Sequence, residues 1–317
     1  MIEGIKRHSA LVCVSGREEK RLLAIEKELK DCDLMLARDG FGNLIVSKNG
    51  LAAVDTAVIV PVDTEGYYIN HIEGDGSLRI GAVGDVPKDA SSHTLITENG
   101  VIGKVSDNAK KIIDCTVDIG AKSKSEAETS VSVGDTLSLY NPVYLSENAL
   151  NGAHLSTGAM LALVLDIIKA QGISHRVCVI FATQCAVGMR GARCAEYLAD
   201  AKRAVLLSAI DEKLSPSGKG AAIVIKDADI ISDVLMARAV EDFANEQRID
   251  ASVAVTGEAS AFQNILSIGR HGTRLLKIAL PVDNIRGQNE SVNTGDLTEC
   301  ERIIGALLAD KIPFERI

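Results

Sequence analysis

The sequence lacks an apolar run long enough to cross a membrane. The best candidate, Ala159 to Ile168, is short and is interrupted by Asp166, whereas a spanning helix needs about 20 apolar residues. The apolar stretch near the N-terminus, Ala10 to Val14, is too short for the core of a secretory signal peptide. We therefore expect a cytoplasmic protein that does not insert into membranes.

A disulfide framework and the common catalytic signatures are also missing. The seven cysteines are odd in number and scattered, with no CxxC pair, which favours reduced thiols. No P-loop, HExxH or GxSxG motif occurs. The glycine-rich stretch Gly74 to Gly84 lies between expected strands and opens no helix. It therefore indicates a turn and not a phosphate-binding loop.

What is present is an acidic chain of ordinary globular composition. Over 317 residues, 46% are hydrophobic and the formal net charge is -9. Such a length is enough for one large core or two smaller ones. An acidic surface repels phosphate backbones and anionic lipid, so we expect neither nucleic acid nor membrane as a partner.

Hydrophobic periodicity predicts an α/β order in two parts of the chain. Ser15 is expected to cap a helix over Arg17 to Lys30, before strands at Leu44 to Ser47 and Ala57 to Val62. After Asn148, strands and helices alternate, which predicts a largely parallel sheet covered on both faces. The helices expected there are Ser156 to Gln171, Met189 to Ala199, Ile230 to Gln247, Ala259 to Ile265 and Leu297 to Lys311.

Between these parts lies a segment of a different kind. From Tyr67 to Leu139, short β-rich pieces alternate with turns rich in Gly, Asp, Asn and Ser, which is typical of a small all-β domain. The predicted division is an α/β domain from 1–65 and 150–317, interrupted by a β domain at 66–149.

Four segments carry a family resemblance. They are DGFGNLI at Asp39 to Ile45, VDIGAKS at Val117 to Ser123, TQCAVGMRGA at Thr183 to Ala192, and IKDA at Ile225 to Ala228. In this order and spacing they resemble the glutamyl/deblocking aminopeptidases, metallopeptidase family 42. The resemblance covers nearly the whole chain. It implies a three-layer α/β aminopeptidase core with a small all-β insert.

The family's chemistry depends on a cluster of histidines and carboxylates. Two metal ions, usually zinc or cobalt, share a bridging carboxylate and a bridging water, and a glutamate acts as general base. The resemblance therefore implies metal ligands at five positions of this chain and a glutamate at a sixth.

Those six positions hold other residues here. By resemblance, the ligand histidines fall at Pro61 and Arg286, and the bridging aspartate falls at His154. The adjacent ligand glutamate falls at Ala186 and a ligand aspartate at Ser208. Pro61 and Ala186 have no donor atom on the side chain, and Arg286 is a permanent cation.

The general base falls at Cys185, and the residue that supports the first histidine is retained as Asp63. With a neighbouring His154, Cys185 could be a reactive thiol, or it could be a buried inert one. His154 could equally be a polar residue at a helix start. Arg286 could neutralise Asp63 or bind an anionic ligand.

Three functions remain open from these residues. The first is a non-hydrolytic homologue that binds a ligand or assembles, with no metal cofactor. The second is a zinc or cobalt aminopeptidase whose ligands are displaced to neighbours such as Asp63, Glu65, Asp211 or Glu290. The third is a metal-free thiol hydrolase that uses Cys185 and His154.

The resemblance also bears on partners. It implies assembly through the inserted β domain into a dimer or a higher homo-oligomer. The cleft that holds the metal ions in the family could still bind a ligand in this chain. Loss of its carboxylates and the presence of Arg286 favour an anionic or carboxylate-bearing small molecule or peptide, with Asp63 and His154 beside it.

Overall fold

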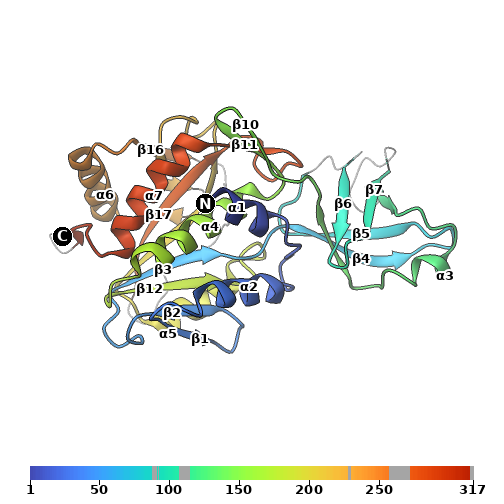
Figure 1. Cartoon of the computed structure of the whole chain (residues 1–317), viewed down its shortest axis with the longest axis horizontal. Coiled ribbons are helices and arrows are strands. Elements are labelled where there is room, and N and C mark those ends of the chain that lie inside the picture. The colour runs from blue at the N-terminus through green and yellow to red at the C-terminus, as the bar shows by residue number, and fades with distance from the viewer. Residues whose placement is uncertain (88–90, 92, 107–114, 228–229, 257–271, 315–317) are drawn as a thin grey trace.

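A mixed sheet forms the centre of the larger part of the molecule (Figure 1). This computed structural model describes residues 1–87, 91, 93–106, 115–227, 230–256 and 272–314. In that part of the chain the strand order is β1-β2-β12-β3-β13-β17-β14-β15, with β16 paired to β14. The strands are β1 (Met35–Arg38), β2 (Leu44–Ser47), β3 (Thr56–Pro61), β12 (Val177–Ala182), β13 (Arg203–Asp211), β14 (Ala221–Asp227), β15 (Ile230–Ile231), β16 (Ala251–Thr256) and β17 (Arg274–Val282).

Parallel pairing is confined to the middle and one edge of this sheet. Strands β12, β3, β13 and β17 run parallel, and β16 runs parallel to β14. The strands β1 and β2, and the β14–β17 pair, are antiparallel. The sheet therefore contains more antiparallel pairs than the largely parallel sheet that the sequence predicted. The parallel strands β3, β12, β13 and β17 are almost wholly buried, as is usual for strands covered on both faces.

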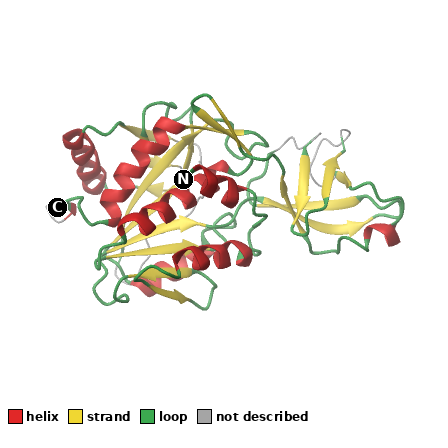
Figure 2. Ribbon diagram, viewed as in Figure 1, coloured by secondary structure: helices red, strands yellow, loops and turns green. Residues whose placement is uncertain are grey.

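Helices cover both faces and give three layers (Figure 2). Five helices pack on one side with the larger apolar core, and α5 packs on the other side with a smaller one. The helices are α1 (Ile2–Ser9), α2 (Glu19–Leu29), α4 (Leu155–Gln171), α5 (Arg190–Ala199), α6 (Val234–Gln247) and α7 (Thr294–Leu308). This confirms the predicted α/β aminopeptidase-like architecture.

The long helix α4 follows directly from its sequence. Nearly every residue from Leu155 to Ile168 is buried, and Gly172 ends the helix with a φ of 72°, which glycine adopts without steric cost. At Gly158, Ser9 of α1 comes so close that an added Cβ would lie 2.1 Å from its Oγ and 2.8 Å from its backbone nitrogen. The glycine therefore permits the α1–α4 contact.

The smaller part of the molecule is a closed barrel with strand order β4-β5-β8-β7-β6-β9, drawn to one side of the core in Figure 1. Alternate residues such as Tyr67, Ile69 and Leu78 point into its interior. The strands are β4 (Gly66–Ile72), β5 (Leu78–Val83), β6 (Thr94–Thr97), β7 (Ile102–Val105), β8 (Thr116–Asp118) and β9 (Thr136–Leu139), with the short helix α3 (Lys124–Ala127) between β8 and β9.

The chain leaves the barrel after Leu139. The next two strands, β10 (Tyr144–Ser146) and β11 (Ala149–Gly152), form a small antiparallel sheet with β18 (Glu290–Asn293). This sheet lies directly before α4 and α7 along the chain. No helix among the described residues is both long and apolar enough to span a bilayer.

Several helix predictions need correction. The helix expected from Ile230 begins at Val234, because Oδ1 of Asp233 caps it by accepting from the amides of Leu235 and Met236. The helix expected to be capped by Ser15 begins at Glu19, with Glu18 as its N-cap. Helix α1 and strand β1 were not predicted. The helix expected over 259–265 lies outside the described residues.

Candidate functional site

The loop that follows β12 is held by buried carboxylates. Oδ1 of Asp63 accepts a hydrogen bond from the amide of Cys185, and Oδ2 accepts one from the amide of Ala186, both at 2.8 Å. Asp63 is fully buried. Burial raises the pKa of this carboxyl, the hydrogen bonds from the two amides lower it, and the nearby Glu18 carboxylate raises it. The pKa that results from these effects is about 7. Asp63 thus positions the loop and does not pair with Arg286.

Glu18 holds the same loop from the other side. Its Oε1 accepts from the amide of Gln184 at 2.9 Å and from the amide of Gly16 at 2.8 Å. In the sequence, Glu18 lies within the helix that was expected over Arg17 to Lys30. No local signal could have revealed the contact with Gln184, because the two residues are 166 positions apart.

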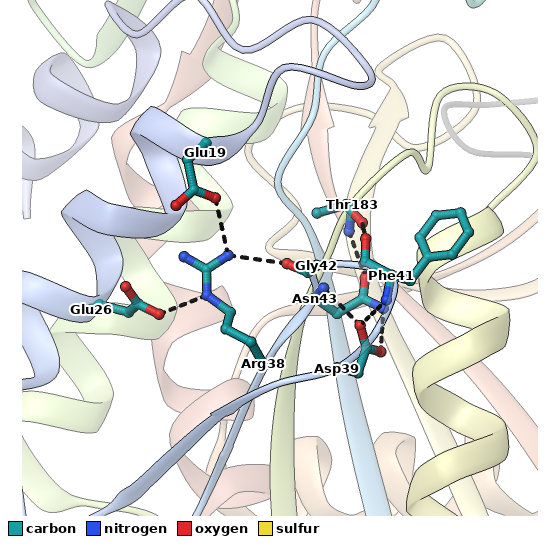
Figure 3. Close-up of polar contacts among 8 residues, drawn as sticks. All are labelled: Glu19, Glu26, Arg38, Asp39, Phe41, Gly42, Asn43 and Thr183. Carbon is teal, nitrogen blue, oxygen red and sulfur yellow. Dashed lines mark hydrogen bonds and ion pairs between the residues drawn. The ribbon is translucent and has the colours of Figure 1, made fainter.

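A third buried side chain ties the loop to the edge of the sheet (Figure 3). Oδ1 of Asn43 accepts from both the amide and the hydroxyl of Thr183, at 2.9 and 3.1 Å. Its Nδ2 donates to Oδ2 of Asp39 at 2.6 Å and to the carbonyl of Gly191 at 2.9 Å. The Asp39 to Ile45 and Thr183 to Ala192 segments, which carried the resemblance, therefore meet through Asn43.

Cys185 and His154 do not share hydrogen-bond partners. The Cys185 thiol is buried against the carbonyls of Ala182 and Thr183. Burial raises its pKa well above the usual range, and the Asp63 and Glu18 carboxylates add to this. A thiol in such surroundings stays protonated and is a poor nucleophile. This geometry argues against a reactive Cys185.

His154 is directed toward the end of the barrel. Nε2 of its ring contacts Oγ of Ser138 and, at 3.1 Å, the carbonyl of Leu139. Burial lowers the pKa of His154 to about 4, and the Arg21 cation lowers it further. The imidazole is therefore neutral at physiological pH. Its backbone is left-handed, with a φ of 59°, at the N-cap of α4.

Arg286 lies in a cluster of ion pairs between the core and the barrel. Its Nε lies 3.3 Å from a carboxylate oxygen of Glu65, and its Nη1 donates to Asp85 in the turn after β5. The side chains of Arg286 and Glu65 are only 15% and 16% exposed. Burial raises the pKa of Glu65, and Arg286 opposes that shift. Sequence reasoning missed Asp85, which is 201 residues from Arg286.

Glu290 is committed to local backbone groups. It accepts from the amide and hydroxyl of Ser156, at 2.7 and 3.0 Å, and from the amide of Arg286 at 2.6 Å. Burial raises its pKa to about 7, while these hydrogen bonds oppose the shift. Asp211, the last acid considered as a displaced ligand, accepts from the amide of Lys213.

The remaining predicted positions are small or inert. Pro61 ends β3 and is buried opposite Ala182 of β12, and Ser208 is buried within β13, where its hydroxyl donates to a carbonyl.

A Cβ added to Gly84 of the barrel would lie 2.8 Å from Cγ of Glu65 and 3.2 Å from Cβ of Ala186. The barrel turn therefore packs directly against Ala186.

These contacts bring some of the candidate residues together and keep others apart. Asp63 joins Cys185 and Ala186, and Arg286 joins Glu65, Asp85 and the Glu290 loop. Within the described ranges, no group of three His, Cys, Asp or Glu side chains is arranged to hold a metal ion.

Comparison with known proteins gives a consistent result. The family model described as M42 glutamyl aminopeptidase matches residues 42–303. A putative aminopeptidase of Acetivibrio thermocellus is 25% identical over 96% of this chain and 97% of its own length. A lysyl aminopeptidase of Pyrococcus furiosus is 24% identical over 90% of each chain.

Solved structures agree on the fold. An aminopeptidase from the archaeon Desulfurococcus kamchatkensis superposes with a TM-score of 0.90 at 22% identity, covering 98% of this chain and 95% of that one. The TET1 peptidase of Pyrococcus horikoshii, described as assembling into a tetrahedron or a large octahedral shell, gives 0.87 at 23% identity, covering 98% and 99%. The chain therefore belongs to the M42 glutamyl aminopeptidase family.

Proposed function

We propose that this protein is a non-hydrolytic member of the family, which has lost the dinuclear metal ligands and the catalytic glutamate and acts by binding or assembly. One observation carries the proposal: the Arg286 guanidinium, at a position where the resemblance implies a ligand histidine, forms ion pairs with Glu65 and Asp85. The Arg286 cation thus pairs with the negative charges of Glu65 and Asp85, which leaves them unavailable to a metal ion.

Electrostatics support this reading. Two unit charges about 4 Å apart repel by about 4 kcal/mol at an effective dielectric constant of 20, and a divalent ion doubles that cost. A co-catalytic site also needs about three protein ligands for each metal ion. Pro61 and Ala186 offer no donor atom, and Ser208 is a neutral donor engaged with a carbonyl. The aligned residues therefore do not fit the zinc or cobalt pair.

The alternative of displaced ligands finds little support in the contacts. Asp63 and Glu290 each accept hydrogen bonds from two backbone amides, and Glu65 faces Arg286. Moving any of them onto a metal would leave buried amides or a buried cation without those partners, which costs about 1–3 kcal/mol for each group. We therefore expect these acids to stay where they are.

Metal analysis combined with a peptidase assay tests the proposal. Protein purified without chelator is expected to hold far less than one zinc, cobalt or manganese ion per chain. It is also expected to release no N-terminal amino acid from peptides when these metals are added. Stoichiometric metal together with chelator-sensitive release would overturn the proposal. The lysyl aminopeptidase of Pyrococcus furiosus, treated in parallel, is the positive control for the assay.

The second part of the proposal is that this protein assembles with further copies of itself. We propose a dimer or a higher homo-oligomer in which the inserted barrel takes part. One solved structure of a TET1 peptidase is described as a dodecamer in the asymmetric unit, and a second TET1 structure is described as assembling into a tetrahedron or a large octahedral shell. Light scattering at micromolar concentration is expected to give a mass at least twice the chain's 33.6 kDa. A monomer at that concentration would reject this part.

An anionic ligand at Arg286, the other partner considered, would have to compete with carboxylates already in place. Of the two, Asp85 is the one that can yield, because its side chain is 68% exposed whereas that of Glu65 is 16% exposed. The ion pairs neutralise the guanidinium, which reduces the gain from binding another anion.

A further inference from the structure

A partly enclosed cavity of about 180 Å³ lies where the core meets the barrel. Three stretches line most of it: residues 9–12 at and beyond the end of α1, residues 138–143 at and beyond the end of β9, and the Ala153–His154 pair before α4. Apolar cavities of about 150 Å³ are large enough to take up benzene. The space therefore fits one molecule with the size of a single aromatic ring.

The lining excludes charged ligands. It contains no Lys, Arg, Asp or Glu, and its one titratable imidazole, that of His154, is neutral because burial lowers its pKa to about 4. The nearby Arg21 is engaged elsewhere, since its guanidinium donates to the carbonyls of Val62, His8 and Leu11. A charge placed in this cavity would lose its hydration without gaining a counter-ion.

The tautomer of His154 defines what the ligand must offer. Nε2 lies 3.1 Å from the carbonyl of Leu139, and a carbonyl can only accept, so this hydrogen bond requires the proton on Nε2. The hydroxyl of Ser138, which also contacts Nε2, then accepts from the same N–H. In a neutral imidazole the other nitrogen, Nδ1, is then an acceptor. Of the residues that the structure describes, none is hydrogen-bonded to Nδ1. The ring that lines the cavity thus offers one acceptor.

We propose that this cavity binds a small uncharged molecule with an apolar body and one O–H or N–H group that donates to Nδ1 of His154. Apolar walls such as Leu11, Val12 and Ile96 take the body of the ligand, and the imidazole orients it. The proposal goes beyond the loss of the metal site. Metal content and ligand binding are measured separately, so either result can fail without the other.

Three probes with a single aromatic ring test the proposed site by calorimetry and by thermal shift. Phenol has the donor, anisole replaces it with a methyl ether, and benzoate carries a negative charge. We expect saturable binding of phenol, binding of anisole that is about five- to tenfold weaker because one hydrogen bond is lost, and no binding of benzoate. Failure of phenol to bind at millimolar concentration, or equal binding of benzoate, would overturn the proposal.

Two variants locate the binding. Ala10 is exposed and lines the cavity, so Ala10→Trp is expected to block it, whereas Ala53→Trp, at another exposed alanine that does not line it, leaves phenol binding unchanged. His154→Gly removes the ring and its acceptor, and glycine adopts the left-handed backbone of this position without steric cost. It is expected to abolish the preference for phenol over anisole. Equal phenol binding by both tryptophan variants, or a preference that survives in His154→Gly, would contradict the assignment.

Discussion

Replacing Asp227 with alanine is expected to lower the free energy of unfolding by about 3–5 kcal/mol. The Lys277 ammonium, on β17, donates to the Asp227 carboxylate on β14, and both side chains are almost fully buried. Burial lowers the pKa of Lys277, whereas the Asp227 charge raises it. Removing the carboxylate leaves the ammonium in a medium of low dielectric constant, and that desolvation is the source of the loss.

Urea unfolding at a fixed protein concentration measures this change. The double variant Asp227→Leu/Lys277→Met removes both charges and is expected to recover most of the stability, because hydrophobic replacement of a buried pair is often neutral or stabilising. Lys6→Ala, which breaks an exposed pair with Glu3, is the control and should cost less than about 1 kcal/mol. A single variant as stable as the wild type would show that the pair does not stabilise the sheet.

The second large effect is expected at Asn43. Asn43→Ala should destabilise the protein by about 3–5 kcal/mol, because each buried group left without its partner costs about 1–3 kcal/mol. The variant removes the hydrogen bonds to Thr183 and Asp39 (Figure 3) and the one to the carbonyl of Gly191. The loss is also expected to loosen the loop that carries Cys185 and Ala186, since Thr183 begins that loop.

Two measurements separate a local effect from a global one. Chemical unfolding gives the stability change, and hydrogen exchange of the amides in residues 183–190 reports on the loop. Asn49→Ala, at an exposed position close to Asn43 in sequence, serves as the matched control and should change stability by less than about 0.5 kcal/mol. Unchanged exchange in the loop of Asn43→Ala would show that Asn43 is not what holds it.

Local sequence signals predicted the elements whose burial is almost continuous. Helix α4 runs from Leu155 to Gln171, within one residue of the prediction, because its apolar run and Gly172 define both ends. Helix α1 was missed, since only a few of its residues are apolar and it is buried by a contact with α4 that depends on Gly158. Strand β1 was missed for a similar reason, as its burial alternates weakly at the sheet edge.

The sequence by itself determined the family, the three-layer fold, and the chemistry of the side chains at the positions where the resemblance implies metal ligands. Pro61 and Ala186 have no donor atom in any conformation, so that much needed no coordinates. The tertiary structure decided which groups meet. Arg286 faces Glu65 and Asp85 and not Asp63, Asp63 holds the amides of the loop after β12, and His154 turns its Nε2 to the carbonyl of Leu139. Most of these partners are more than a hundred residues apart. The pairing of β3 with β12 brings Asp63 to the loop after β12, and the packing of the barrel on the core brings Asp85 to Arg286.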